Sequence, residues 1–129
     1  IGADDAGMAL ERAGGIALVA GRLVMTEPGA NRVVAIDADS GQARGVYPGA
    51  YALPRGVAAV RDRAAITDVL GAAIHVLNAD GTPTHTIDER TVPAWPPGGP
   101  EGVAWYERMD RLYVTDADFG RVVIFNVRM

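Results

Sequence analysis

Apolar residues occur along this chain in short runs of four or five, separated by segments rich in Gly, Asp, Asn and Pro. Runs this short, dominated by Val, Ile and Leu, predict β-strands, because a helix that buries one face needs a longer pattern with a period of 3.6 residues. The intervening residues are those that favour turns. The main predicted strands are 15–19, 22–26, 32–37, 56–60, 63–67, 73–78, 102–106, 111–115 and 121–126.

These nine strands are three copies of one pattern. In each copy a Gly opens the first run, a Thr ends the second run, and an Asp or Asn ends the third. The spacing from Thr to the final Asp or Asn is identical in all three copies, whereas the spacing from Gly to Thr is identical in the first two and slightly longer in the third. The three sets are Gly15, Thr26 and Asp37; Gly56, Thr67 and Asn78; and Gly102, Thr115 and Asn126. A repeat of 41 to 46 residues indicates supersecondary units that stack or form a ring.

A fourth, weaker strand is expected at 43–47 and at 84–87, which gives four antiparallel strands per repeat. Four such strands in about 40 residues are typical of a propeller blade, so the sequence predicts an all-β fold: one β-propeller domain over residues 1–129. The blades are expected at about 13–48, 53–88 and 100–129, and residues 8–12 could supply the fourth strand that the last blade lacks. Because propeller rings have four to eight blades, three blades are read as half of a six-bladed ring, completed either by a homodimer or by further blades of a longer chain.

Composition excludes several classes of protein. No apolar run approaches the length of about 18 residues that a membrane span needs. The net charge is −4 and all 12 basic residues are Arg, scattered along the chain, whereas nucleic-acid binders carry a basic patch. The chain has no Cys, which excludes disulfides and thiolate sites and favours an extracytoplasmic (periplasmic or secreted) location. The first residues lack Met and a signal pattern, as expected of a mature protein or of a fragment.

Residues 102–126 resemble the NHL and YVTN class of propeller repeats, through Gly-Val-Ala, Leu-Tyr-Val-Thr-Asp and Gly-Arg-Val-Val-Ile-Phe-Asn. The first repeat, with Asn-Arg-Val-Val at 31–34, is similar to the NHL form, whereas the second has Ala72-Ala73 in place of Asn-Arg. The resemblance implies the fold. Its members include peptide- and protein-binding platforms, RNA binders, lyases and sugar-lactone hydrolases, so it does not choose a function.

A carboxylate directly follows the Thr of each repeat, and an Arg follows five residues later in two of the three. The sets are Glu27 with Arg32, Asp68 with Ala73, and Asp116 with Arg121. An ion pair across each hairpin loop would satisfy both charges. In the second repeat the Arg is missing, so Asp68 is predicted to be the least satisfied carboxylate and the one most available to a ligand.

The alternative for these carboxylates is calcium. The loops between second and third strands and those that lead into the first strand share one face of a propeller, here called the loop face, and oxygen ligands suit a hard cation. The residues expected to form this acidic rim are Glu27, Asn31, Asp68, Glu101, Asp116 and Asp118. The segment 100–105 also resembles the part of regucalcin-type lactonases that carries a metal-binding Glu. The resemblance implies Glu101 as the metal ligand, but the other ligands of that family have no matching positions.

His75 and His85 fall on neighbouring strands of one hairpin, without an evident third ligand for zinc. His75 aligns with Val34 and Val123 of the other repeats, so a half-buried strand position is its simpler interpretation. The connection 88–100 is the longest in the chain and carries Trp95 between prolines. Loops on rigid scaffolds often bind partners, so Trp95 is expected either to cover the edge of a blade or to contact a partner.

The sequence therefore favours a binding platform for a protein, a peptide or a small molecule, without a cofactor. The candidate ligand-binding residues are Trp95, Arg55, Asp68, Asn31 and Glu101. Two other functions stay open: a calcium-dependent lactonase or esterase centred on Glu101, and an architectural subunit of a larger complex.

Overall fold

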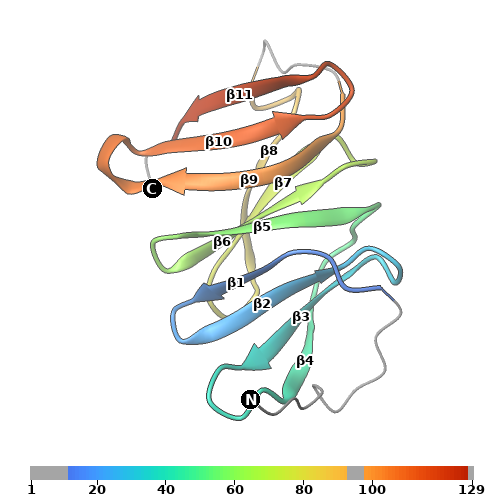
Figure 1. Cartoon of the computed structure of the whole chain (residues 1–129), viewed down its shortest axis with the longest axis vertical. Helices are drawn as coiled ribbons and strands as arrows, with labels where there is room; N and C mark the ends of the chain where they lie inside the picture. The colour runs from blue at the N-terminus through green and yellow to red at the C-terminus, as the bar shows by residue number, and fades with distance from the viewer. Residues whose placement is uncertain (1–11, 93–97, 128–129) are drawn as a thin grey trace.

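The computed structural model describes residues 12–92 and 98–127, and these form three antiparallel β-sheets (Figure 1). Sheet 1 contains β1 (Ile16–Val19), β2 (Arg22–Glu27), β3 (Arg32–Asp37) and β4 (Ala43–Tyr47). Sheet 2 contains β5 (Pro54–Val60), β6 (Arg63–Asp68), β7 (Ala73–Leu77) and β8 (Pro83–Ile87). Sheet 3 contains β9 (Pro100–Tyr106), β10 (Arg111–Asp116) and β11 (Arg121–Asn126), with the short 3-10 helix η1 (Glu107–Met109) between its first two strands. The predicted all-β repeat, with its strands paired in chain order, is confirmed.

The turn between the first and second strands differs among the repeats without disturbing the strand register. In sheet 1 it is formed by Ala20 and Gly21, whose φ angles of 48° and 80° are the left-handed values that a tight two-residue hairpin needs. In sheet 3 the turn is longer and forms η1, which ends at Asp110 with φ 49°. Tyr106 and Arg111 then pair across this longer turn, as Val19 and Arg22 pair across the shorter one.

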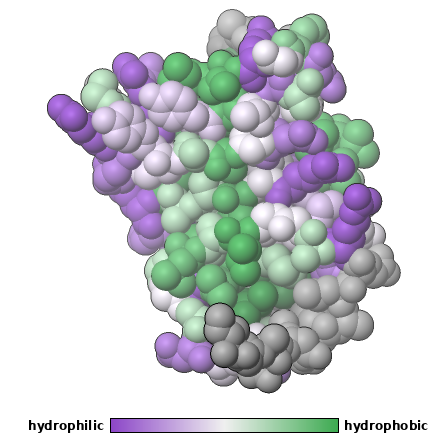
Figure 2. All heavy atoms as spheres, in the orientation of Figure 1, coloured by the Kyte–Doolittle hydropathy of each residue, from purple (hydrophilic) through white to green (hydrophobic). Residues whose placement is uncertain are grey.

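The first strands of the three sheets lie side by side, so that β9, β5 and β1 run down the centre of the molecule (Figure 1). In the same view, apolar side chains gather in a band over these strands, with hydrophilic side chains on both sides (Figure 2). Two hydrophobic clusters hold the sheets together. The cluster between sheets 1 and 2 contains Val19, Val24, Val33, Ala35, Tyr47, Tyr51, Ala64, Ile66 and Leu77. The cluster between sheets 2 and 3 has Val60, Ala65, Ile74, Leu112 and Val114 at its centre.

The repeated Thr and Gly residues form a lock between neighbouring sheets. The Thr26 hydroxyl accepts a hydrogen bond from Gly15 N at 2.9 Å and donates one to Arg55 O, in sheet 2, at 2.5 Å. At the next boundary, the Thr67 hydroxyl accepts from Gly56 N at 2.8 Å and donates to the carbonyl oxygen that precedes Gly102, again at 2.5 Å. Each Thr therefore ties its own first strand to the first strand of the next sheet.

Sheet 3 ends one strand short within the described residues, as the sequence predicts. The predicted closing strand at 8–12 falls outside these residues except for Arg12, which is not in a strand. The described part of the chain contains no helix that is long and apolar enough to cross a membrane.

Candidate functional site

The loops after β2, β6 and β10 lie beside the segments that lead into the first strands, as expected for a loop face. Val69 N donates to Leu53 O at 3.0 Å, and Ala117 N donates to Gly99 O at 3.2 Å. Asn31, at the end of the β2–β3 loop, is exposed and has φ 52°. With its side-chain nitrogen turned toward the Ala52 and Pro28 carbonyls, its amide donates to both at 2.9 Å.

The two predicted ion pairs across these loops are confirmed. Arg32 Nε lies 2.6 Å from Glu27 Oε2, and Arg121 Nε lies 3.1 Å from Asp116 Oδ2. Glu27 and Asp116 are buried, with exposed fractions of 0% and 5%, so each carboxylate is directed into its own hairpin. The expected acidic rim is therefore wrong for these residues, because the cross-strand partner draws each carboxylate inward.

Asp68 is also buried and well satisfied, so the prediction that it is the least satisfied carboxylate is wrong. It accepts hydrogen bonds from the backbone nitrogens of Ala52, Leu53 and Gly71, at 2.8 to 3.1 Å. Its Oδ2 atom also lies 3.3 Å from His75 Nε2. The missing Arg is thus replaced by a His two positions further along the same strand and by the backbone of the loop before β5.

These hydrogen bonds set the charge of Asp68. Burial alone would raise its pKa, but the bonds from His75 and from the three backbone N–H groups lower it to about 2, from an ordinary 3.8. The same carboxylate, together with burial, raises the pKa of Tyr51 to about 12, the burial being the larger cause. Asp68 is therefore ionised at neutral pH.

We expect the protein to lose stability in acid partly through Asp68. A carboxyl group whose pKa is lower in the folded state stabilises the fold above its ordinary pKa, and this contribution, at most about 2 kcal/mol here, disappears as the pH falls through the folded value. Urea unfolding of the wild type and of Asp68→Asn, followed from neutral pH to about pH 2, should show the difference between the two proteins shrinking below about pH 4. A constant difference over this range would contradict the assignment.

The two histidines do not form a metal site. His75 pairs with Thr86 and His85 pairs with Val76 across β7 and β8, so the two imidazoles project from opposite faces of the sheet. His75 is half-buried, as the repeat alignment predicts, and its ring packs edge-on against Tyr51 with centroids 5.1 Å apart.

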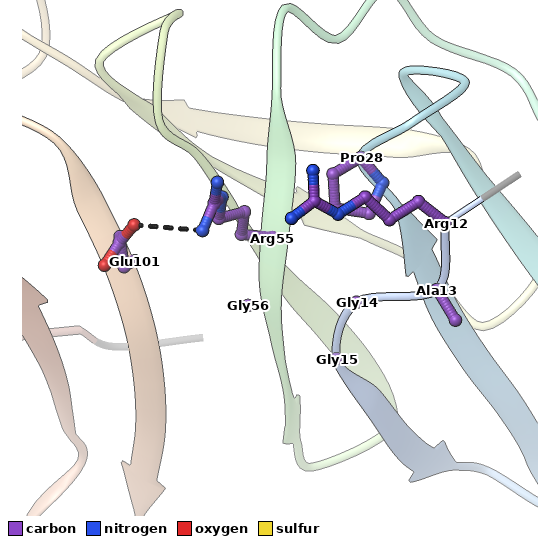
Figure 3. Close-up of a pocket in the computed structure, with 8 residues that line it drawn as sticks. All are labelled: Arg12, Ala13, Gly14, Gly15, Pro28, Arg55, Gly56 and Glu101. Carbon is purple, nitrogen blue, oxygen red and sulfur yellow. Dashed lines mark ion pairs between the residues drawn. The ribbon is translucent and has the colours of Figure 1, made fainter.

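A shallow depression of about 360 Å³ opens on the loop face where the first strands of the three sheets begin (Figure 3). Arg55, in β5, and Glu101, in β9, form an ion pair across the sheet boundary, with Arg55 Nη1 3.3 Å from Glu101 Oε1. The side chain of Arg12 extends from the other side of the depression toward β5 (Figure 3). The rest of the lining is Ala13, Gly14, Gly15, Pro28 and Gly56.

Of the five predicted ligand-binding residues, Arg55 and Glu101 come together in this depression. Asp68 and Asn31 instead both contact Ala52, in the loop before β5, and Trp95 lies outside the described residues. Arg12 was not predicted, because residues 8–12 are read as a strand and the pattern gives no sign that a later loop lies beside them.

Glu101, the predicted calcium ligand, is engaged by a guanidinium. Within residues 12–92 and 98–127 there is no group of three or more His, Asp or Glu side chains that could hold a metal ion. What the depression offers is two guanidinium groups, one carboxylate and the exposed backbone of glycines.

Comparisons with known proteins show the fold. No family model and no curated relative matches the chain. The structure of U3-55K matches 94% of this chain and 37% of its own, with a TM-score of 0.72 and 17% identity. Catalytically inactive virginiamycin B lyase from Staphylococcus aureus, solved with Quinupristin, matches 91% of this chain and 42% of its own, with a TM-score of 0.66 and 22% identity. Kuenenia stuttgartiensis hydrazine synthase matches 90% of this chain and 36% of its own, with a TM-score of 0.68 and 14% identity.

The chain thus spans about two fifths of the length of these proteins. A further match is to the WD40 repeats of RRP9, with a TM-score of 0.71 at 17% identity. At these identities the likeness concerns architecture alone, and the resemblance to NHL and YVTN repeats stays a prediction. The three sheets are blades of a partial β-propeller.

Proposed function

We propose that this propeller unit is a binding platform whose loop face takes an acidic segment of a peptide or protein at the depression formed by Arg12, Arg55 and Glu101. The observation that carries the proposal is the excess of guanidinium groups there. The three side chains come from three different parts of the chain: Arg55 and Glu101 lie at the starts of β5 and β9, and Arg12 lies in the segment that leads into β1. Side chains on loops and strand ends of a rigid scaffold are a common basis of recognition.

The local charge differs from that of the whole chain. Glu101 neutralises Arg55, whereas Arg12 has no acidic partner in a salt bridge among the described residues, so the depression is positive although the chain carries −4 overall. A guanidinium donates two parallel hydrogen bonds to a carboxylate. The exposed glycines beside it leave room for an extended segment to approach the backbone.

Replacing Arg55 with Gln should weaken the binding of an acidic peptide about tenfold, because a hydrogen bond to a charged group contributes about 1.5 kcal/mol or more. The probe is a capped hexaglutamate peptide, with capped hexalysine as its counterpart, titrated while the amide NMR signals are followed. Shifts are expected at Gly15 and Gly56, which line the depression.

The matched control is Arg44→Gln. Arg44 is an exposed arginine in β4, where it pairs with Asp37, and its loss should leave peptide binding unchanged. Equal binding of hexalysine, or an equal loss of affinity in the control, would contradict the proposal. The alternative function, a calcium-dependent lactonase or esterase centred on Glu101, has a different test. It would be supported if millimolar calcium raised the melting temperature of the wild type but not that of Glu101→Gln.

A further inference from the structure

The ion pair between Arg55 and Glu101 is looser than the two ion pairs that cross the hairpins of sheets 1 and 3. Each of those pairs is hydrogen-bonded, and its carboxylate is buried. Arg55 Nη1 lies 3.3 Å from Glu101 Oε1, but these two groups make no hydrogen bond, and their side chains are 45% and 38% exposed. Water therefore reaches both members of the pair, and either can turn toward another partner.

The backbone, and not this ion pair, holds the two residues in place. The carbonyl oxygen of Arg55 accepts the hydrogen bond from Thr26, and that of Glu101 accepts the one from Thr67. The two side chains thus start from fixed points on neighbouring sheets. Because an exposed ion pair adds little to stability, Arg55 can change its partner without loosening the boundary between the sheets.

The two guanidinium groups of the depression differ in what already occupies them. Arg55 lies between Glu101 on one side and Arg12 on the other (Figure 3). Arg55 faces the Glu101 carboxylate, whereas the Arg12 side chain makes no ion pair with any described residue. A first carboxylate of an incoming segment can therefore approach Arg12 without displacing a described side chain. A second carboxylate that binds Arg55 meets Glu101 there.

We propose that Glu101 is an internal competitor for the acidic segment: it occupies Arg55 in the free protein, and a segment must present two carboxylates to displace it. This inference rests on the binding function proposed above. Glu101 repels a ligand carboxylate beside it, and the repulsion is relieved when its half-exposed side chain turns into solvent. Arg12 then selects for one negative charge, and Arg55 with Glu101 selects for a second. Glu101 thereby sets the specificity of the depression.

The opposite role for Glu101 would be to position Arg55 for the ligand. A positioning carboxylate strengthens binding, so its removal weakens the complex. A competing carboxylate weakens binding, so its removal strengthens the complex. The two roles therefore predict changes of opposite sign for the same substitution, and a loss of fold alone cannot produce the gain.

Glu101→Gln should bind capped hexaglutamate about fivefold more tightly than the wild type, because a partly exposed ion pair no longer has to be broken. Amide NMR titration measures the affinity, and the spectrum of the free variant checks that it is folded. Glu89→Gln is the matched control, since Glu89 is exposed and does not line the depression. Its effect should stay below about twofold, because salt screens exposed charges that are not in contact.

Unchanged or weaker binding by Glu101→Gln would overturn the proposal. An equal gain in Glu89→Gln would do so as well, because affinity would then follow the net charge of the chain and not the carboxylate beside Arg55.

A peptide with a single carboxylate, capped Gly-Gly-Glu-Gly-Gly-Gly, tests the requirement for two. In the wild type it should shift the side-chain Nε signal of Arg12 and leave that of Arg55 in place, whereas hexaglutamate should shift both. In Glu101→Gln the same peptide should shift both signals. A shift of the Arg55 signal by this peptide in the wild type would show that Glu101 does not compete.

These results separate the proposal from the function on which it rests. If hexaglutamate binds the wild type and Glu101→Gln gains nothing, the competitor is overturned and the binding platform stands. If only Glu101→Gln binds, the competitor is supported and the platform is overturned for the native chain. If neither protein binds hexaglutamate, both proposals are overturned.

Discussion

Replacing Gly56 with alanine is expected to lower the free energy of unfolding by about 3 kcal/mol, at the upper end of what overpacking a core usually costs. The added Cβ would collide with Glu101 O and lie 2.9 Å from the Thr67 hydroxyl. Neither neighbour can move freely, since both belong to the hydrogen bond that joins sheets 2 and 3. The sheets must separate or the strand must shift, and each response exposes part of the cluster around Ile74 and Leu112.

Urea unfolding measures this effect, with Gly102→Ala as the control at the equivalent position. The Gly102→Ala variant should lose less than about 1 kcal/mol, as expected of a position without a packed neighbour. Equal losses in the two variants would show that the glycine serves its own strand and not the boundary between sheets.

Replacing Asp68 with alanine is expected to cost about 2–4 kcal/mol at neutral pH, because the backbone N–H groups of Ala52, Leu53 and Gly71 lose a buried acceptor at once. Asp68 is 2% exposed, so water cannot take its place without opening the loop. His75 loses its carboxylate partner as well.

The comparison for this variant is Asp118→Ala, in an exposed loop of the next repeat, which should change stability by less than about 0.5 kcal/mol. Thermal unfolding and urea unfolding should both show that Asp68→Ala is less stable than Asp118→Ala. Amide hydrogen exchange should show that Ala52, Leu53 and Gly71 become unprotected in Asp68→Ala. A loss of stability below about 1 kcal/mol, with the three amides still protected, would contradict the role assigned to this carboxylate.

Most of the fold could be predicted because its determinants are local and repeated. Short apolar runs bounded by turn residues place the strands, and the constant distance from Thr to the final Asp or Asn fixes the second hairpin in all three repeats. The ion pairs of Glu27 and Asp116 follow from the same logic, since their partners lie directly across a short hairpin.

The site was less predictable, because its contacts join segments that are distant in sequence. The loop that binds Asp68 lies about 15 residues earlier in the chain, and its contribution is made by backbone N–H groups, which have no signature in the sequence. His75 could have been found, because alternate residues of a strand share a face and it stands two positions after the missing Arg. The position of Arg12 beside Arg55 depends on how two sheets pack, which no single repeat encodes.

At the residue before each repeated glycine, the backbone and the side chain have separate roles. The Thr hydroxyl recognises only the carbonyl oxygen of the residue before the next glycine, and every amino acid supplies that oxygen. The bond therefore does not depend on the side chain at this position, which is Arg55 in one repeat and Glu101 in the next. The main chain carries the hydrogen bond between neighbouring sheets, whereas the side chains of Arg55 and Glu101 line the depression. Substitutions at these two positions can therefore change the charge of the depression without removing the bond between the sheets.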